Sequence, residues 1–256
     1  MKKNDQYYMI QMSLDTDKLY RLAKERNLPL LDAEVGYLVH CTVKELFGDS
    51  APKPFALNPN SQENKLKLRD LPVLGFSDKS ATELEEIAKS FSEPKVYSIC
   101  KWEDLASKPM PTMWKEGQRL DFSLRSVPVV RKSKDGIKHK KGAEVDVFLS
   151  KCWEVGDPER IVDRAAVYRE WLAEKFERSE GALLLQSRLS SFRREKLLRR
   201  THGGTRKAKC VERPSALFEG TLKVKDSEAF SNMVRNGIGR HKAFGFGMLL
   251  LRPAKG

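Results

Sequence analysis

Apolar side chains fall into short, separate runs along the first hundred residues, and their spacing switches between strand and helix periods. Residues 7–14 combine aromatic and aliphatic side chains over a strand's length. Two segments with helical spacing follow, and Pro29 and Gly48 mark their ends. The predicted elements are a strand at 7–14, helices at 15–27 and 32–47, a loop at 49–64, a strand at 65–74, a helix at 80–91 and a strand at 95–100.

The second half opens with a strictly alternating segment at residues 118–125. Leu120, Phe122 and Leu124 point to one side, while Arg119 and Arg125 point to the other with the remaining polar residues, which predicts a half-buried strand. Further elements are predicted as a basic turn at 132–142, a helix at 158–178, a strand at 182–192, an arginine-rich exposed hairpin or mobile loop at 193–213, a strand at 215–224, a helix at 227–236 and a strand at 243–251.

The order of these elements predicts the fold class. The second half gives the strand, helix, strand, strand, helix, strand order of a ferredoxin-like domain, and the first half is compatible with the same order plus an extra helix. We therefore expect an α+β protein with two tandem ferredoxin-like (RRM-like) domains, at residues 1–105 and 118–256. Residues 103–117 contain Pro109, Pro111 and Gly117, and are expected to link the two.

Positive charge is concentrated in two stretches. The 256 residues carry a formal net charge of +13. Residues 115–142 hold nine Lys/Arg against three Asp/Glu, and residues 181–213 hold ten against two, so the rest of the chain is nearly neutral. A generally basic surface without a ligand is the alternative, but localised charge favours a face that binds a polyanion such as RNA.

The composition gives no sign of a metal centre or a membrane segment. Cys41, Cys100, Cys152 and Cys210 are scattered, and the four histidines show no paired spacing typical of metal ligands. No apolar run approaches the roughly 20 residues that span a bilayer, and the N-terminus lacks the features of a signal peptide. We expect no metal, no cofactor and a cytoplasmic protein.

A glycine-rich stretch near the C-terminus is the most specific motif. Residues 237–247 read Gly-Ile-Gly-Arg-His-Lys-Ala-Phe-Gly-Phe-Gly, with Gly237, Gly239, Gly245 and Gly247 spaced around a basic triplet. Such glycines let backbone amides approach a phosphate, or they serve only a tight turn between a helix and a strand. The stretch precedes a strand and lacks Gly-Lys-Ser/Thr, so neither a dinucleotide-binding nor a Walker motif fits.

This stretch resembles the C-terminal glycine-rich motif of the CasE subfamily of CRISPR-associated RNA-processing nucleases. Residues 217–224 and 117–128 resemble the family's preceding strand and its central strand. The resemblance covers the second half well and the first half more weakly. It implies a metal-independent endoribonuclease that cleaves precursor CRISPR RNA at repeat hairpins. In the family the ribose 2′-hydroxyl attacks, leaving a 2′,3′-cyclic phosphate, and the mature RNA stays bound within a CRISPR surveillance complex of type I-E or type IV.

The family places a catalytic histidine on an N-terminal helix, sometimes with a tyrosine one turn earlier. Tyr37 and His40 match, because their i, i+3 spacing puts both rings on one face of the predicted helix. The imidazole pKa near neutrality suits proton transfer in either direction. The alternative is a histidine that only packs in the helix. His139, His202 and His241 compete for the role, and they lie in basic turns or in the glycine motif.

RNA contacts are expected from the two basic stretches and the glycine motif. A solvated loop is the alternative for the arginines, and a non-cleaving hairpin-RNA-binding subunit of a CRISPR ribonucleoprotein is the alternative for the whole protein. The Lys or Arg that stabilises the phosphorane stays open among Lys242, Arg188 and Arg193. The residues expected to bind RNA are Arg119, Arg125, Arg188, Arg193, Arg194, Arg199, Arg200, Arg240, Lys242, Gly237, Gly239, Gly245 and Gly247.

Overall fold

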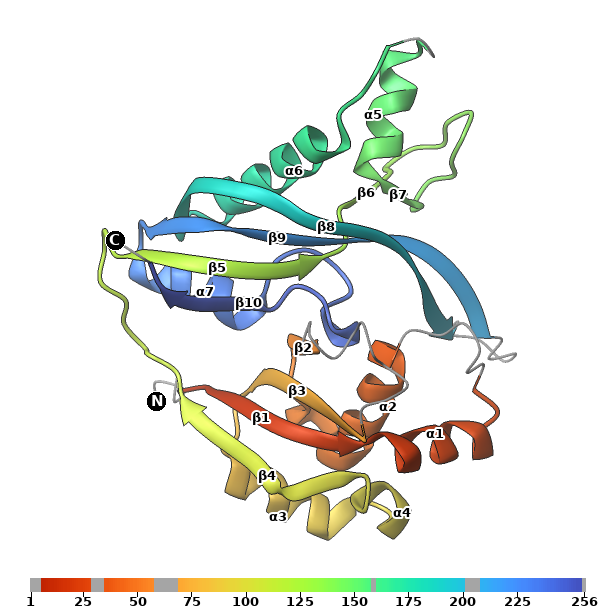
Figure 1. Cartoon of the computed structure of the whole chain (residues 1–256), viewed down its shortest axis with the longest axis vertical. Coiled ribbons are helices and arrows are strands. Elements are labelled where there is room, and N and C mark those ends of the chain that lie inside the picture. Colours follow the sequence, from red (N-terminus) through yellow and green to blue (C-terminus); the bar gives the residue numbers. More distant parts are fainter. Residues whose placement is uncertain (1–5, 29–34, 58–68, 158–159, 201–207, 255–256) are drawn as a thin grey trace.

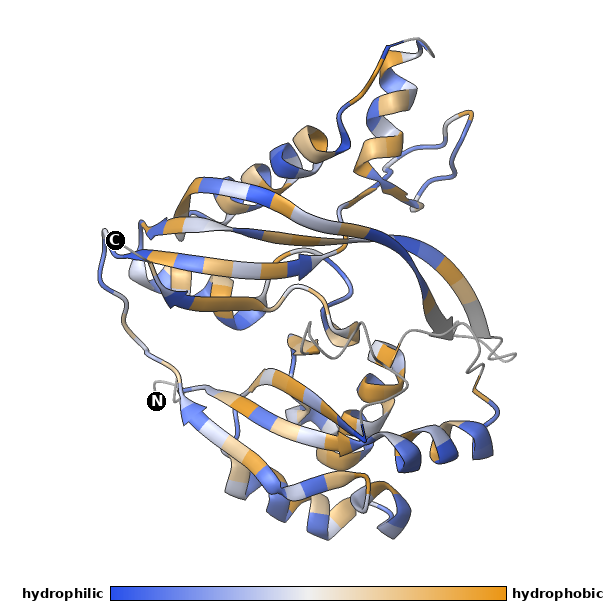
Figure 2. Cartoon of the chain, in the orientation of Figure 1, coloured by the Kyte–Doolittle hydropathy of each residue, from blue (hydrophilic) through white to orange (hydrophobic). Residues whose placement is uncertain are grey.

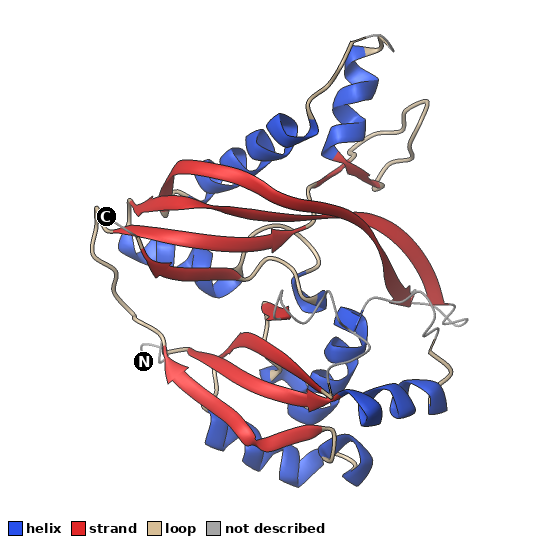
Figure 3. Ribbon diagram, in the orientation of Figure 1, coloured by secondary structure: helices blue, strands red, loops and turns tan. Residues whose placement is uncertain are grey.

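Two four-stranded antiparallel sheets form separate layers of the molecule (Figure 1). The structure is a computed structural model that describes residues 6–28, 35–57, 69–157, 160–200 and 208–254, with the side chains of 198–200, 208 and 209 excluded. Within these ranges helices and strands alternate in both halves, so the expected α+β class is confirmed. Figure 3 shows the strands as red layers with blue helices packed against them.

The first sheet has the strand order β2-β3-β1-β4. Ile10, Met12 and Leu14 alternate along the central strand and are fully buried beneath the helices. Figure 2 shows this alternation of hydrophobic and hydrophilic residues along the strands. The elements are β1 (Tyr8–Asp15), α1 (Thr16–Glu25), α2 (Val35–Phe47), β2 (Phe55–Leu57), β3 (Asp70–Ser77), α3 (Ala81–Phe91), α4 (Pro94–Tyr97) and β4 (Cys100–Pro109), with a 3-10 turn η1 (Gly48–Ser50) after α2.

The second sheet has the order β10-β5-β9-β8. Phe122 and Leu124 of its strand β5 pack against Tyr168 and Phe176 of α6 and Phe230 of α7 in one core. The elements are β5 (Arg119–Ser126), α6 (Arg164–Ser179), β8 (Ala182–Arg200), β9 (Ala208–Val224), α7 (Ser227–Asn236), a 3-10 turn η3 (Lys242–Phe244) and β10 (Leu249–Pro253). Between β5 and α6 the chain adds β6 (Val129–Arg131) and β7 (Glu144–Asp146), which pair to form the projecting hairpin. The helix α5 (Val147–Val155) follows and projects from the body with it (Figure 1).

The two layers share apolar contacts. Tyr7 and Phe76, from the first sheet and the residue before it, are buried in the core of the second half, with their ring centroids 5.6 Å apart. The Arg235 guanidinium of α7 lies 5.6 Å from the centre of the Tyr7 ring. Continuous packing of this kind fixes the relative position of elements from both halves.

The prediction of a strand at residues 95–100 is wrong. Pro94–Tyr97 form the short helix α4, with Pro94 in its first turn, where a fixed φ and a missing N–H cost nothing. Strand β4 begins at Cys100 and continues to Pro109, so residues 103–109 of the expected linker pair with β1. β4 is an edge strand with many exposed side chains, so its sequence lacks the alternation of apolar and polar residues that predicts a strand.

The arginine-rich stretch is paired strand rather than mobile loop where it is described. β8 and β9 pair without a break in the ladder from Ala182 with Val224 to Arg200 with Ala208, apart from two register shifts. The predicted hairpin is therefore confirmed for residues 193–200 and 208–213, and its tip, with His202, lies outside the described residues. β8 and β9 together form the arginine-rich ribbon. Glu195 and Leu197 of this ribbon face inward at 8% and 5% exposure, so one of its sides is buried.

Other elements begin or end at residues that differ from the predicted ones. The strand predicted at 65–74 is β3, Asp70–Ser77, and residues 65–68 lie outside the described ranges. The helix predicted from 158 begins at Arg164, where the Asp163 side chain caps it. Residues 243–248 of the predicted last strand form η3 and a turn, since the glycines there adopt positive φ. The helix α5 and the strands β2, β6 and β7 are not among the predicted elements.

We predict that Leu124→Ala destabilises the protein by about 2–5 kcal/mol, because Leu124 is fully buried in the central strand β5 and its truncation leaves a cavity. Leu183→Ala is the matched control, since Leu183 is 55% exposed, and should cost less than about 1 kcal/mol. Urea unfolding of both variants measures the difference, and equal midpoints would contradict the core assignment.

Candidate active site

Helix α2 places Tyr37 and His40 on the face that meets the glycine-rich segment. Their ring centroids are 6.5 Å apart, and both side chains are half-buried. Leu38 and Val39, between them, turn inward and are buried in the first core. The helix therefore holds the two predicted catalytic side chains on its outer side, as their spacing indicated.

Phe244 of the turn η3 covers this pair. Its ring stacks on Tyr37 at 6.0 Å between centroids and meets His40 edge to face at 5.1 Å. The contact is close because α2 carries Gly36 at the crossing point: a methyl group there would overlap the backbone carbonyl of Phe244. The structure thus brings the predicted catalytic helix and the glycine-rich motif together.

His40 sits in a positive and partly dehydrated environment. Burial lowers its pKa most, and the ammonium groups of Lys44 and Lys53 lower it further, because each disfavours a second positive charge. Lys44 is itself partly neutralised by Asp49, at 2.6 Å. The imidazole is therefore held in its neutral form at pH 7, where it can accept a proton.

Lys242 serves the local structure and adds charge to the site. Its ammonium donates hydrogen bonds to the carbonyl oxygens of Asn236, at 2.7 Å, and Gly237, at 3.3 Å, which closes the C-terminal end of α7. Burial and the nearby Lys53 lower the pKa of Lys242. A phosphate bound between these two lysines would be stabilised, because its negative charge would offset their mutual repulsion.

A groove of about 470 Å³ runs beside this cluster. Lys53, Arg213, Arg240 and Lys242 supply positive charge to its walls, with Phe244 at the end nearest His40. Its remaining lining is Glu144, Leu197, Val211, Gly239, His241 and Ala243. Through Phe244 the groove adjoins the candidate catalytic residues, and Leu197 and Val211 connect it to the second sheet.

Glu144 organises the basic side chains of the groove. It is hydrogen-bonded to His241 at 2.8 Å and to Arg240, and forms an ion pair with Arg213 at 3.4 Å. The hydrogen bond from His241 and the charge of Arg240 lower the pKa of Glu144 to about 2, although burial opposes them. A carboxylate this acidic stays ionised at any pH near neutrality and fixes three basic groups in one arrangement.

The four glycines of the motif have positive φ values, between 67° and 88°. At Gly247 a side chain would also meet the carbonyl oxygen of Ile238, while Ile238 donates its own amide to the Gly247 carbonyl at 2.8 Å. These contacts explain why position 247 requires a glycine: the turn is too tight for a side chain. Contact of Gly237, Gly239, Gly245 or Gly247 with RNA stays a prediction.

Several predicted RNA-binding arginines are held by carboxylates. Arg125 lies in a buried ion pair with Glu195, which also pairs with Arg193, and its guanidinium lies 4.4 Å from the centre of the Phe246 ring. Only 12% of the Arg125 side chain is exposed. Arg125 therefore stabilises the base of the ribbon, and a contact with RNA stays a prediction for it.

Other arginines predicted to bind RNA have exposed side chains where these are described. Arg188 pairs with Glu219 at 2.7 Å and Arg194 with Glu212 at 3.5 Å, yet their side chains are 76% and 53% exposed. Arg119 is exposed at the start of β5. The side chains of Arg199 and Arg200 lie outside the described residues.

Comparison with known proteins decides the family. The family described as CRISPR associated protein matches residues 7–253, almost the whole chain. The chain belongs to this CRISPR-associated protein family. A relative within it, the CRISPR-associated endoribonuclease Cse3 of Thermus thermophilus, is 31% identical over 148 residues, or 57% of this chain. The aligned part spans 61% of that relative's length.

Solved structures of CRISPR-associated proteins share the fold. A Cse3 endoribonuclease bound to a 19-nucleotide RNA matches 97% of this chain and 100% of its own, with a TM-score of 0.63 and 21% identity. Cas6e from Escherichia coli K-12 matches 96% of this chain and 100% of its own, with a TM-score of 0.57 and 18% identity. The expected tandem ferredoxin-like (RRM-like) fold is thereby confirmed, while the boundaries 1–105 and 118–256 stay predictions.

Sequence reasoning missed three site residues of this CRISPR-associated protein. Lys53 lies in a segment predicted only as a loop, Phe244 lies in the glycine motif but is neither a glycine nor part of its basic triplet, and Glu144 follows the predicted basic turn. Phe244 alone had a usable signal, because it is an aromatic residue between a basic triplet and two glycines. Among the described residues, no three His, Cys, Asp or Glu side chains gather as metal ligands, and no helix there is long and apolar enough to cross a membrane.

We predict that Lys53→Gln raises the pKa of His40 toward its ordinary value without reaching it, because burial, the larger cause, remains. Lys95→Gln is the matched control, since Lys95 pairs with Glu25 and is not among the charges acting on His40. An NMR titration of the histidine rings, assigned with His40→Gln, measures the shift. An unchanged or lower pKa in Lys53→Gln would show that the two groups are not coupled.

Proposed function

We propose that this chain is a metal-independent endoribonuclease that cleaves precursor CRISPR RNA at repeat hairpins. The 2′-hydroxyl beside the scissile phosphate attacks, and the products carry a 2′,3′-cyclic phosphate and a 5′-hydroxyl. The protein then stays bound to the mature RNA within a multi-protein CRISPR surveillance complex in the cytoplasm. His40 and Tyr37 are the proposed catalytic residues.

One observation carries the proposal. The half-buried Tyr37–His40 pair lies under Phe244 and beside a groove with four cationic side chains. Cleavage by an internal hydroxyl requires a proton acceptor for the 2′-hydroxyl, a cation near the phosphate and a proton for the leaving 5′-oxygen. The pair offers the acceptor and the groove offers the cations, while water supplies the proton.

The environment of His40 favours the role of general base. The pKa of His40 is lowered, so the neutral imidazole accepts the proton of the 2′-hydroxyl as the oxygen attacks phosphorus. Lys53 and Lys242 then face the negative charge that grows on the phosphorane oxygens. As the bond from phosphorus to the 5′-oxygen breaks, the leaving oxygen takes a proton from water and departs as the 5′-hydroxyl. Tyr37, one turn before His40, orients the hydroxyl or the phosphate.

Family membership and the basic ribbon support binding of hairpin RNA. Proteins of the same fold have been solved with a 19-nucleotide RNA and in a CRISPR RNA-guided surveillance complex. In this chain Arg188, Arg193, Arg194 and Arg240 are exposed along the ribbon and the groove. Such side chains reach phosphates and the shape of an A-form stem more easily than base edges.

We predict that the wild-type protein cleaves the repeat RNA of its own CRISPR array in EDTA, and that His40→Ala lowers the single-turnover rate by about 10²–10⁴-fold. The affinity for RNA should change less than about tenfold, because His40 contributes proton transfer rather than charge. Gel analysis of cleavage, filter binding and analysis of the product ends give the three readouts.

His139→Ala is the matched control, since His139 lies in the projecting hairpin and stacks on Trp153 rather than on the α2 site. It should leave the cleavage step unchanged. Normal cleavage by His40→Ala would reject the site. Tight binding without any cleavage by the wild type would instead favour a non-cleaving hairpin-RNA-binding subunit, and products without a cyclic end would reject the 2′-hydroxyl mechanism.

We predict that the single-turnover rate at sub-saturating enzyme, which reports the ionisation of the free protein, rises with pH and levels off once His40 is neutral. In the free protein, this plateau begins below the ordinary histidine pKa of about 6.5, because burial and Lys53 favour the neutral form. The sign follows from the role of base: protonated His40 cannot accept a proton, so the rate falls as the pH falls. A rate that falls with rising pH across this range would assign His40 as the acid instead.

A further inference from the structure

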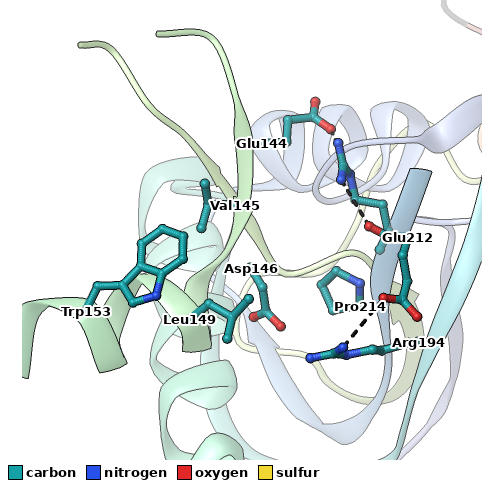
Figure 4. A pocket seen from close by; sticks show the side chains of 9 residues that line it. Glu144, Val145, Asp146, Leu149, Trp153, Arg194, Glu212 and Pro214 are labelled. Carbon is teal, nitrogen blue, oxygen red and sulfur yellow. Dashed lines mark hydrogen bonds and ion pairs between the residues drawn. The ribbon is translucent and has the colours of Figure 1, made fainter. Parts of the chain in front are cut away.

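A second, smaller pocket lies between the projecting hairpin and the arginine-rich ribbon. Its volume is about 220 Å³. Glu144, Val145 and Asp146 of β7, with Leu149 and Trp153 of α5, form one side, and Arg194, Glu212, Arg213 and Pro214 form the other. Figure 4 shows Trp153 at one end and the Arg194–Glu212 pair at the other, with Asp146, Leu149 and Pro214 between them.

The charges in this pocket disfavour a phosphate. Asp146 is buried and already accepts hydrogen bonds from the amide of Phe148 and the hydroxyl of Tyr168, and it pairs with Arg164. Glu144 is equally committed to the groove arginines and His241. With Glu212, the lining holds three carboxylates against two guanidinium groups, those of Arg194 and Arg213, so it favours a neutral group over an anion.

The remaining lining suits a flat, neutral ring. Trp153 is partly exposed, with His139 nearly parallel to it at 6.2 Å between centroids, and the Lys138 ammonium 5.7 Å from its ring. Leu149, Val145 and Pro214 add apolar surface. Nucleobases stack on aromatic side chains in this kind of setting, whatever their identity.

The exposed ion pair at the far end can read the edge of such a ring. Arg194 and Glu212 are 3.5 Å apart, and their side chains are 53% and 54% exposed. A guanidinium donates and a carboxylate accepts, so together they complement an edge that carries both an acceptor and an N–H. A surface pair of this kind contributes little to stability, so it can exchange partners at small cost.

Position links the pocket to the catalytic groove. Glu144 and Arg213 line both, so the two hollows share a wall. A strand of RNA whose phosphates lie against Lys53 and Lys242 can therefore direct a neighbouring base to the other side of that wall. We propose that this pocket takes one unpaired base of the RNA bound in the groove, with Trp153 as the stacking surface and Arg194 and Glu212 at its edge.

This inference rests on the proposed function, and its test separates the two. The probe is the repeat RNA of the chain's own array, with the scissile nucleotide in its 2′-deoxy form so that binding is measured without cleavage. Each unpaired nucleotide is replaced in turn by an abasic one. We expect one position where the loss of the base weakens binding to the wild type by about five- to 150-fold, the range that one stacked base contributes.

Trp153→Ala should bind the intact RNA correspondingly more weakly and lose the sensitivity to that position, while Trp153→Phe, which keeps a ring, should retain most of it. Glu212→Gln should reduce the sensitivity in part. Phe91→Ala is the control for loss of an exposed aromatic residue, and Glu174→Gln for an exposed pair with arginine; both should behave as the wild type.

Three outcomes overturn the inference: no sensitive position, a sensitive position that Trp153→Ala leaves unchanged, or no binding of the RNA at all. Cleavage of the unmodified RNA is scored separately. An uncleaved RNA that still shows the coupling between the base and Trp153 rejects the proposed catalysis and keeps the pocket. Normal cleavage without the coupling between the base and Trp153 rejects the pocket and keeps the proposed catalysis.

Discussion

Phe244 rests against helix α2 at a distance that only a glycine at position 36 permits. Through this contact the turn after α7 meets the face of α2 that carries Tyr37 and His40. Removing it would leave the histidine exposed on one half of the molecule and Lys242 on the other. The burial that lowers the pKa of His40, and the groove beside it, both follow from the docking of these two segments.

Carboxylates determine how the excess of positive charge is arranged. Glu144, Glu195 and Glu219 each hold one or more arginines of the ribbon or the groove. Such pairs reduce repulsion among the cations and limit their conformations before any ligand is bound. Lys53 and Lys242 are a contrast, since both line the groove and the charge of Lys53 lowers the pKa of Lys242. The groove thus combines arginines that are paired with a carboxylate and two lysines that repel each other.

Local patterns predicted much of this site, and long-range packing explains the rest. The i, i+3 spacing of Tyr37 and His40 is a property of one helix, so the sequence alone places both on one face. The glycine motif likewise signalled its positive φ values. That the motif would lie on α2 could not be seen, because Gly36 and Phe244 meet only in the folded chain.

Charge patterns were ambiguous for a related reason. Residues 193–213 look like a solvated loop when their side chains are counted, but Leu197 and Glu195 face inward, and the backbone of 193–200 pairs with that of 208–215 as a ladder. Arg125 was equally well placed for a ligand or for Glu195, and only the fold selects the partner. The edge strand β4 could not be predicted from its sequence because few of its side chains are buried, so apolar and polar residues do not alternate along it.

The contact between α2 and η3 also ties the site to the order in which the chain is made. Translation releases Phe244 only about two hundred residues after His40. A ribosome-bound chain in which α2 has emerged, and η3 has not, holds the histidine without its aromatic cover, without Lys242 and without one wall of the groove. The arrangement around His40 therefore forms only once η3 has folded back onto α2.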